Sequence, residues 1–367
     1  MSTPSQAEVR RMIAAAGTIV VKVGSSSLTQ PSGHLDPDKL DALAAALAQV
    51  RLMGGRVVLV SSGAIAAGFG PLGFDSRPVD VATQQATAAV GQGLLMARYE
   101  TAFGRFGIRV GQILITAEDT IRATQYRNVE RTLDRLLDLG VVPIINENDS
   151  LASNEIRFGD NDRLSALVAN LVRAEALVLL TDVDALYTAP PSQPGSRRVE
   201  YVPNVIDALG DIQVSGSGSK VGTGGMVTKL EAARVAAVSG IPTVLTCASN
   251  AGPAMMGDPV GTVFAPVKAR GSSRRGTIVV DAGAGQAIRG GRASLLAAGA
   301  LEVHGDFSAG DPVWIDAESG EHLARGLAGF DSEEIPQMLG RNTAQLKRFL
   351  GPQYAHPLVH RDNLVLV

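Results

Sequence analysis

Short apolar runs alternate with stretches of helical periodicity through the first 250 residues of the chain. The apolar runs are rich in Val, Ile and Leu, and they predict strands at 18–23, 56–60, 110–114, 141–145, 176–180 and 243–247. Helical patterns lie between them, at 37–53, 82–103, 124–139, 161–173 and 228–239. Strands this apolar are typical of a mostly parallel sheet that is covered by helices on both faces. We therefore expect an α/β fold, a three-layer sandwich around a mostly parallel sheet.

The pattern changes after residue 250, where glycines become frequent and the apolar runs become shorter. These short runs predict strands at 277–280, 312–315 and 363–367. A basic stretch rich in Arg, Gly and Ser precedes the first of them. About ninety residues are enough for a small domain of its own. We expect a first domain at 1–265, a linker at 266–276 and a small, mainly-β domain at 277–367.

Small or acidic residues follow four of the predicted strands. They are Gly24-Ser25-Ser26-Ser27, Ser61-Ser62-Gly63-Ala64, Asn146-Glu147-Asn148-Asp149 and Thr181-Asp182. In open parallel sheets, ligands bind beyond the carboxyl ends of the strands. The sequence therefore predicts a ligand site at that edge of the sheet.

Two polar clusters, residues 146–150 and 159–162, are the most informative part of the chain. The first follows an apolar strand, and the second begins an apolar helix. Carboxylates and amides near a core are costly unless they are paired or bind something. A turn and a helix cap would explain Asp149 or Asp160 taken singly. Seven Asn, Asp and Glu residues in two blocks favour a site for a polar ligand and a metal ion.

Two glycine-rich loops have the composition of phosphate-binding loops. In residues 22–27, Gly24 and the serines follow a strand that carries Lys22, and residues 216–229 lead into a helix, so backbone N–H groups in both could surround an anion. Neither loop is a Walker motif, because the chain contains no Gly-Lys dipeptide. A flexible surface connection is the alternative for residues 216–229. A formal GxGxxG at 68–73 neither follows a strand nor opens a helix, so we discount it.

Composition limits the class of protein. The chain has 367 residues, 45% hydrophobic and 19% charged, with a formal net charge of −3. These values are ordinary for a globular protein and give no sign of a nucleic-acid-binding surface overall. The single cysteine, Cys247, excludes an internal disulfide and a Cys-based zinc site, and its apolar run predicts a buried thiol. No apolar run is long enough to span a membrane, so we expect a cytoplasmic protein.

Histidine is nearly absent from the larger predicted domain. Only His34 precedes residue 300. General acid–base chemistry of the usual kind therefore has few candidates there. Carboxylates, lysines, hydroxyls and glycines remain, and these suit positioning and electrostatic catalysis.

Six motifs in a fixed order match a known family. They are Val-Lys-Val-Gly-Ser-Ser at 21–26, Ser-Ser-Gly-Ala-Ile at 61–65, Asn-Glu-Asn-Asp at 146–149, Gly-Asp-Asn-Asp at 159–162, Leu-Thr-Asp at 180–182 and Gly-Thr-Gly-Gly-Met-Val-Thr-Lys at 222–229. The set resembles the glutamate 5-kinase branch of the amino-acid kinase family, and the tail resembles the PUA domain fused to many of these enzymes. The resemblance implies the amino-acid kinase fold. It also implies ATP-dependent phosphorylation of the side-chain carboxylate of L-glutamate to L-glutamyl 5-phosphate, the first step of proline biosynthesis.

The resemblance also implies roles for individual residues. The catalytic group is Lys22, Lys229 and Asp162, in which the lysines face phosphate and Asp162 holds them in place. The substrate contacts are Ser62, Gly63, Asn146, Asp149 and Asn161. The ATP contacts are Lys22, Gly24, Thr181, Asp182, Thr223, Gly224, Gly225, Met226, Val227, Thr228 and Lys229. No residue is assigned to a metal, because Mg²⁺ is expected to arrive mainly on the ATP phosphates.

Regulation and partners are further expectations from the resemblance. Proline is the expected feedback inhibitor, with Glu155, Ile156 and Arg157 as the candidate responsive loop. A homodimer or homotetramer and channelling of the product to the next reductase are also expected. One alternative is a family member with a different acceptor. The other is an RNA-binding protein that acts through the PUA domain, but residues 276–367 hold seven Arg or Lys against eleven Asp or Glu, and RNA affinity needs cations.

Overall fold

The computed structural model describes most of the chain. The described residues are 3–74, 78–116, 123–148, 161–190, 192–205, 225–266, 276–290, 293–307, 309, 312–351, 354–361 and 364–366. The chain divides near residue 268 into two compact units.

An eight-stranded sheet forms the centre of the first unit. Its strands, in spatial order, are β3 (Val110–Ile115), β4 (Val142–Glu147), β2 (Arg56–Ser61), β1 (Thr18–Val23), β5 (Ala176–Thr181), β9 (Thr243–Cys247), β10 (Thr262–Phe264) and β8 (Tyr201–Val202). All neighbours pair in parallel except β9 and β10. A separate two-stranded ribbon joins β6 (Leu186–Tyr187) to β7 (Arg198–Val199). The prediction of a mostly parallel sheet is confirmed.

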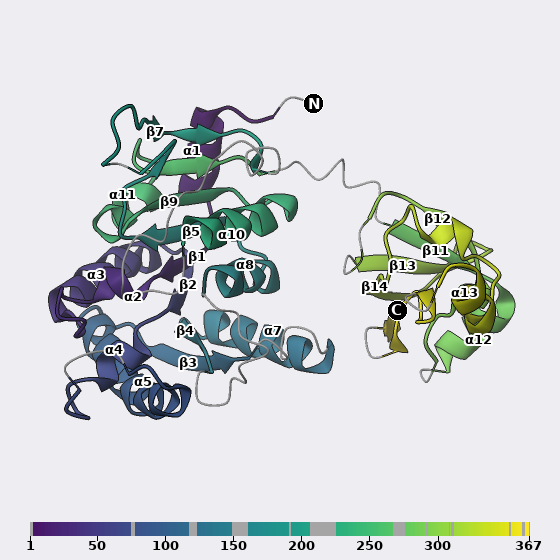
Figure 1. Cartoon of the computed structure of the whole chain (residues 1–367), viewed down its shortest axis with the longest axis horizontal. Helices are drawn as coiled ribbons and strands as arrows, with labels where there is room; N and C mark the ends of the chain where they lie inside the picture. Colours follow the sequence, from purple (N-terminus) through teal and green to yellow (C-terminus); the bar gives the residue numbers. More distant parts are fainter. Residues whose placement is uncertain are drawn as a thin grey trace. The chain divides into compact units, whose positions relative to one another are not determined.

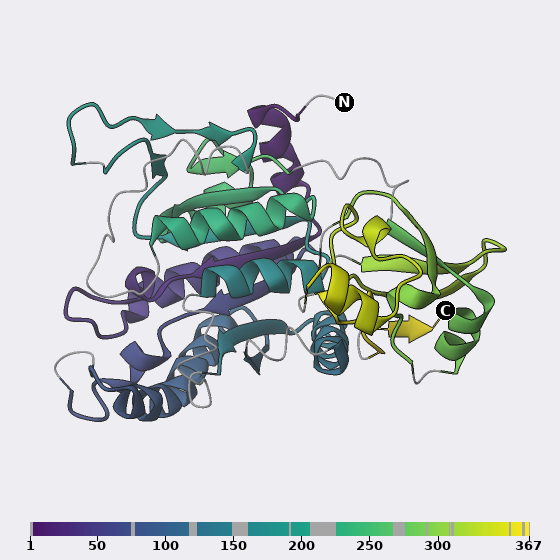
Figure 2. The same cartoon turned by 45° about the vertical axis from the view of Figure 1, so that its right-hand side comes forward.

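Helices cover both faces of this sheet, so the unit has three layers. One face packs against α1 (Gln6–Ala14), α3 (Pro37–Leu52), α5 (Val81–Gly104) and α11 (Ala251–Met255). The other face packs against α7 (Ala123–Asp138), α8 (Asn161–Leu171) and α10 (Met226–Val238). Figure 1 shows α8 and α10 on the opposite side of the strands from α3, and the turned view of Figure 2 shows the sheet between them. Each core face is built from alternate residues of the buried strands.

Local signals in the sequence explain where two of the helices, α3 and α5, begin. At the start of α3, the side chain of Asp36 accepts hydrogen bonds from the backbone N–H groups of Asp38 and Lys39, and Pro37 occupies the first helical position. Asp80 caps α5 in the same way, through the N–H of Thr83.

Two glycines allow α5 to lie directly against α4 (Ala64–Gly68), the short helix that follows β2. A Cβ atom added at Gly91 would lie 1.8 Å from the carbonyl oxygen of Ala64, and one added at Gly68 would lie 2.2 Å from that of Thr87. The two backbones are therefore closer than any side chain would permit. This contact fixes α5 relative to the loop that ends β2.

Gly91→Ala should destabilise the first unit by about 3 kcal/mol, because the new methyl group must push two backbones apart. Gly104→Ala, on the same helix, is the matched control, since an added Cβ there meets nothing within 4 Å. That control should change stability by less than about 1 kcal/mol. Urea unfolding of both variants measures the difference, and equal midpoints would contradict the close packing of α4 and α5.

Several local expectations for the first unit were wrong. Ser61 and Thr181 do not follow β2 and β5 but are their last residues. Asn146 and Glu147 do not follow the strand but form its last two residues, because β4 keeps its register with Leu114 and Ile115 of β3. The helix predicted from residue 228 begins at Met226, with Gly225 as its N-cap. Cys247 is partly exposed rather than buried, because it is the last residue of β9.

The second unit is a five-stranded sheet with helices packed around its core. The strands, in spatial order, are β12 (Ala300–His304), β11 (Gly276–Val280), β13 (Pro312–Ala317), β14 (His322–Leu327) and β15 (Leu364–Leu366). Two helices, α12 (Ala282–Arg289) and α13 (Thr343–Phe349), complete the unit. Ile278, Val313 and Ile315 are fully buried in its hydrophobic core.

The first strand of this unit begins within the segment that we predicted as linker. Gly276 is already paired with Val313. A Cβ atom at this position would lie 2.2 Å from the ring of Phe307, so only glycine fits. Residues 267–275 lie outside the described residues.

None of the described helices is long and apolar enough to cross a membrane.

Candidate active site

A buried carboxylate lies between two lysines at the carboxyl edge of the sheet. The Oδ1 atom of Asp162 is 2.6 Å from the Nζ atom of Lys22, and its Oδ2 atom is 3.1 Å from the Nζ atom of Lys229. The hydroxyl of Thr228 also donates to Oδ2, at 2.9 Å. The side chain of Asp162 is 0% exposed, and those of Lys22 and Lys229 are 2% and 9% exposed.

Three elements bring these charges together. Lys22 is the fifth residue of β1 and shares a face with Val20, which packs in the core beneath α8 and α10. Asp162 lies in the first turn of α8, where the helix dipole favours a negative charge. Lys229 lies in the first turn of α10. The motifs around these three residues are far apart in the sequence, so their meeting depends on the tertiary fold.

The electrostatics of this group suit an anionic ligand. Burying an isolated charge costs several kcal/mol, so buried charges persist where they are paired. Two ammonium groups and one carboxylate carry a formal charge of +1 together. The N-terminus of α10, which has no side-chain cap at Gly225, adds a positive dipole end beside them.

The segment predicted as the first glycine loop is the end of β1 and the short helix α2 (Ser25–Leu28), with Gly24 as the N-cap near the Lys22 ammonium group. A Cβ atom added at Gly24 would lie 3.7 Å from Nζ of Lys22 and 3.8 Å from Oγ of Ser26. A side chain at this position would therefore cover the cation. Glycine leaves that approach open to a ligand.

The other described residues that we predicted to contact ATP lie at the end of β5 or at the start of α10. The hydroxyl of Thr181, the last residue of β5, donates to the carboxylate of the exposed Asp182 at 3.0 Å. Met226 packs against the core beneath α10, whereas Val227 is 46% exposed. The side chains of Thr181 and Met226 thus have structural partners of their own.

Side-chain amides form a series of hydrogen bonds near the carboxyl ends of β2 and β4. The Nδ2 atom of Asn161 is 2.9 Å from Oδ1 of Asn146 and 3.0 Å from Oγ of Ser62. The Nδ2 atom of Asn146 in turn donates to Oε1 of Gln92, at 2.8 Å. Four polar side chains from four different elements and loops thus meet beside Asp162.

Gly63 sets the direction of the chain beside this amide cluster. Its φ angle is +108°, in the left-handed region that favours glycine, and α4 begins at the next residue. The carbonyl oxygen of Ser61 and the hydroxyl of Ser62 both face Asn161 as a result.

Sequence reasoning missed Gln92 and the pair of Ser61 and Tyr99. The Tyr99 hydroxyl lies 2.7 Å from Oγ of Ser61, and burial raises the pKa of Tyr99 above its ordinary value, so the phenol stays protonated. Gln92 looks like an ordinary polar residue of a long helix. Gly91, which directly precedes it, was the one available signal of a close approach.

Several predicted site residues lie outside the described residues. They are Asp149, Glu155, Ile156, Arg157, Thr223 and Gly224. Their roles stay predictions. Within the described residues, no group of three or more His, Cys, Asp or Glu side chains is arranged to hold a metal ion.

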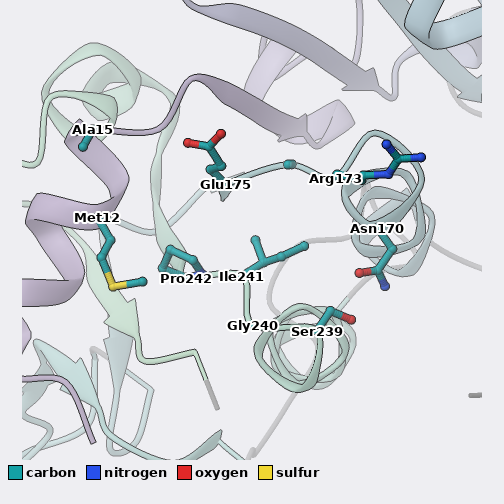
Figure 3. A pocket seen from close by; sticks show the side chains of 10 residues that line it. Met12, Ala15, Asn170, Arg173, Glu175, Ser239, Gly240, Ile241 and Pro242 are labelled. Atoms are coloured by element: carbon teal, nitrogen blue, oxygen red, sulfur yellow. The ribbon is translucent and has the colours of Figure 1, made fainter. Parts of the chain in front are cut away.

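A cavity of about 540 Å³ lies at the other end of the strands (Figure 3). Glu175 and Pro242, which line it, directly precede β5 and β9, so the cavity is at their amino ends. Its charged groups are already engaged, since Arg173 pairs with Glu130 and Glu175 accepts a hydrogen bond from the N–H of Gly17. We therefore place the candidate active site at the carboxyl edge and not in this cavity.

The fold and this site define a class of enzyme. The model of the amino acid kinase family matches residues 17–247, and the model of the PUA domain matches residues 276–350. The chain belongs to the amino acid kinase family, and it carries a C-terminal PUA domain.

Relatives that resemble this chain over their whole length carry a more specific name than the family. The chain is 97% identical to glutamate 5-kinase of Bifidobacterium longum (strain DJO10A), with 100% of both chains covered. It is 53% identical to glutamate 5-kinase of Thermobifida fusca (strain YX), covering 98% of this chain and 96% of the relative. Carbamate kinase from Giardia lamblia bound to AMP-PNP is similar in structure, with 19% identity, a TM-score of 0.49 and coverage of 69% of this chain and 99% of the other.

Proposed function

We propose that this chain transfers the γ-phosphoryl group of ATP to the side-chain carboxylate of L-glutamate. The product is L-glutamyl 5-phosphate, which begins proline biosynthesis. The observation that carries the proposal is the buried carboxylate of Asp162 between Lys22 and Lys229. The name of the relatives supports glutamate as the acceptor.

The main barrier to this reaction is repulsion between anions. A carboxylate must approach a triphosphate, and two unit charges about 4 Å apart repel by about 4 kcal/mol at an effective dielectric constant of about 20. Lys22 and Lys229, held by Asp162, supply fixed positive charge that offsets this repulsion. Their effect is largest in the transition state, where charge spreads over the transferring phosphoryl oxygens.

The nucleophile needs no general base. The side-chain carboxyl of free glutamate has a pKa of about 4.3, so it is ionised at pH 7. This chemistry is consistent with a catalytic unit that has only His34 before residue 300. Catalysis here is positioning and electrostatic stabilisation.

The acceptor and ATP occupy neighbouring parts of the same edge in this proposal. Ser62, Gly63, Asn146, Asp149 and Asn161 contact glutamate, with Asn161 at the junction between the acceptor and the lysines. Gly24, Thr181, Asp182 and residues 223–229 contact the nucleotide. The amide cluster at Asn161 and the open approach above Lys22 support this division.

Mg²⁺ is the metal that a kinase of this class would use. The described donor set near the lysines fits a metal that is carried by the substrate, because both oxygens of Asp162 face lysines. Mg²⁺ keeps waters and binds through substrate phosphates in many kinases. The ion neutralises charge on the phosphates, and no residue of this chain is assigned to it.

An acceptor panel tests the proposal. The purified protein is incubated with ATP and, in turn, glutamate, aspartate, N-acetylglutamate, carbamate and a nucleoside monophosphate. Acyl phosphate is trapped with hydroxylamine, and ADP formation is followed for the acceptors that give no trappable product. We expect glutamate alone to give efficient turnover. Efficient turnover of another acceptor in preference to glutamate would contradict the assignment.

We also propose that proline inhibits the enzyme through a site that overlaps the glutamate pocket. Glu155, Ile156 and Arg157, between the two polar clusters, are the candidate responsive residues. Glu155→Ala should raise the proline concentration needed for half inhibition while glutamate turnover continues. Identical inhibition curves for the variant and wild type would remove this loop from consideration.

A homodimer or homotetramer, with channelling of the unstable product to the next reductase, completes the proposal. The exposed side of α5 supports an oligomer, since Val90 and Leu94, one turn apart, are each 41% exposed. Exposed apolar residues that lie together are typical of association surfaces.

A further inference from the structure

The three amides beside Asp162 form a relay that has a direction. Asn161 Nδ2 donates to Asn146 Oδ1 at 2.9 Å, and Asn146 Nδ2 donates to Gln92 Oε1 at 2.8 Å. The residues come from the start of α8, the end of β4 and the middle of α5. Each amide therefore donates to the next one along the relay.

Backbone groups fix this direction. The two ends of an Asn or Gln amide look alike, so their orientation follows from their partners. The backbone N–H of Glu147, which can only donate, donates to Asn146 Oδ1 at 2.9 Å. The carbonyl oxygen of Ser61, which can only accept, lies 3.2 Å from Asn161 Nδ2. A flip of any one amide would set two donors or two acceptors against each other.

The relay therefore ends in one donor and one acceptor. Gln92 Nε2 and Asn161 Oδ1 are both buried, and neither has a hydrogen-bond partner among the described residues. Asn161 as a whole is only 7% exposed. Buried polar atoms in native structures are nearly always paired, so two such atoms in one small network indicate a ligand that brings the complementary groups.

Gln92 is also held rigidly. Its neighbour Gly91 lies against the carbonyl oxygen of Ala64, so α5 packs closely against the helix that follows Ser62 and Gly63. A donor on a long packed helix is placed more accurately than one on a loop. This rigidity suits a group that selects among similar ligands.

An amino acid presents the two groups that the relay lacks. Its α-carboxylate accepts hydrogen bonds, and its α-ammonium group donates them. The reacting side-chain carboxylate must face Lys22 and Lys229, which are bound to Asp162, next to Asn161 in the chain. Gln92 is at the end of the relay away from these lysines, so its donor is available to the α-carboxylate.

We propose that Gln92 is a specificity-determining residue, whose Nε2 atom donates a hydrogen bond to the α-carboxylate of the acceptor amino acid. The inference rests on the proposed function and adds a contact that the sequence motifs do not contain. A site built to hydrogen-bond one group rejects analogues that lack it, because its buried donor is then left unpaired.

Gln92→Glu tests this contact. The substitution keeps the side-chain length and one oxygen that can accept from Asn146, but it replaces the Nε2 donor by an anionic oxygen. Two acceptors are compared: L-glutamate, and L-isoglutamine, which keeps the side-chain carboxylate but has an α-carboxamide. The KM for glutamate should rise about 10²-fold, and the KM for ATP should not change. The preference for glutamate over isoglutamine, as a ratio of kcat/KM values, should fall at least about tenfold.

Gln49→Glu is the matched control, because Gln49 is an exposed glutamine on α3. It should keep the wild-type ratio. Gln92→Met, which keeps the length without either polar atom, should lower the ratio as Gln92→Glu does and serves if the charged variant does not fold.

The outcomes separate this inference from the proposed function. A wild-type ratio in active Gln92 variants would overturn the inference, even if both acceptors react more slowly, because that result describes a structural role. Wild-type protein that forms no acyl phosphate from glutamate would contradict the proposed function and this inference with it.

Discussion

Lys229→Ala and Lys22→Ala should each lower kcat by about 10²-fold or more. Both ammonium groups are fixed by Asp162, at 3.1 Å and 2.6 Å, so they need no reorganisation when charge develops on the phosphoryl group. A fixed cation in a water-poor site stabilises that charge far more than a mobile one in water. The loss should appear mainly in kcat rather than in KM, because the interaction strengthens in the transition state.

The measurement is steady-state kinetics with saturating ATP and glutamate on variants whose unfolding curves show that they are folded. Lys347→Ala is the control, since this lysine is exposed on α13 in the second unit. It should leave kcat within about twofold of wild type. A near-normal kcat in either folded active-site variant would remove that lysine from the catalytic machinery. Lys22→Met keeps most of the side-chain volume and separates the loss of charge from the loss of packing.

Asp162→Asn should be the most destabilising of the site substitutions, by about 3–5 kcal/mol. It leaves two buried ammonium groups without their carboxylate and sets a neutral amide between them. The same change should lower kcat by at least about 10²-fold, because the lysines lose the group that positions them. Chemical denaturation measures the stability of the first unit, and initial rates measure kcat.

A second substitution isolates the electrostatic cause. Lys22→Met in the Asp162→Asn background removes one of the two cations that lost the Asp162 carboxylate, so the double variant should be more stable than Asp162→Asn alone. Asp41→Asn is the control, since Asp41 pairs with the exposed Arg105 at 2.8 Å and a surface pair contributes about 0–1 kcal/mol. A double variant that is less stable than Asp162→Asn would mean that packing, and not unpaired charge, dominates at this site.

Some site residues can be recognised from sequence motifs, and others only from contacts between distant parts of the chain. Lys22, Asp162 and Lys229 were chosen from motifs, and the fold brings all three into one ion-paired group. Asn161 and Ser62 were likewise chosen separately and are hydrogen-bonded. The motifs lie at the ends of strands or at the starts of helices. Ligands bind at the carboxyl edge of an open parallel sheet, so this grouping could be expected before the fold was known.

Gln92 could not have been chosen in that way. It follows no strand and opens no helix, and a glutamine in a helix is most often solvated. Its proposed role rests on the Nε2 atom, which has no partner among the described residues, and on the hydrogen bond with Asn146 of a different element. Asn146 itself was expected after the strand, and only its pairing with β3 showed that β4 continues through it.

The sequence alone indicates the longer strands and helices of the first unit, although it gave no signal for β6, β7, β8 and β10. Apolar runs determined the strands, because a buried strand must be apolar on both faces, and Asp36 with Pro37 determined the start of α3, because that cap needs no distant partner. Which side chains face one another depends on long-range contacts. The pairing of Asp162 with two lysines, the contact of Gly91 with Ala64 and the direction of the amide relay depend on strand order and helix packing, which no local pattern encodes.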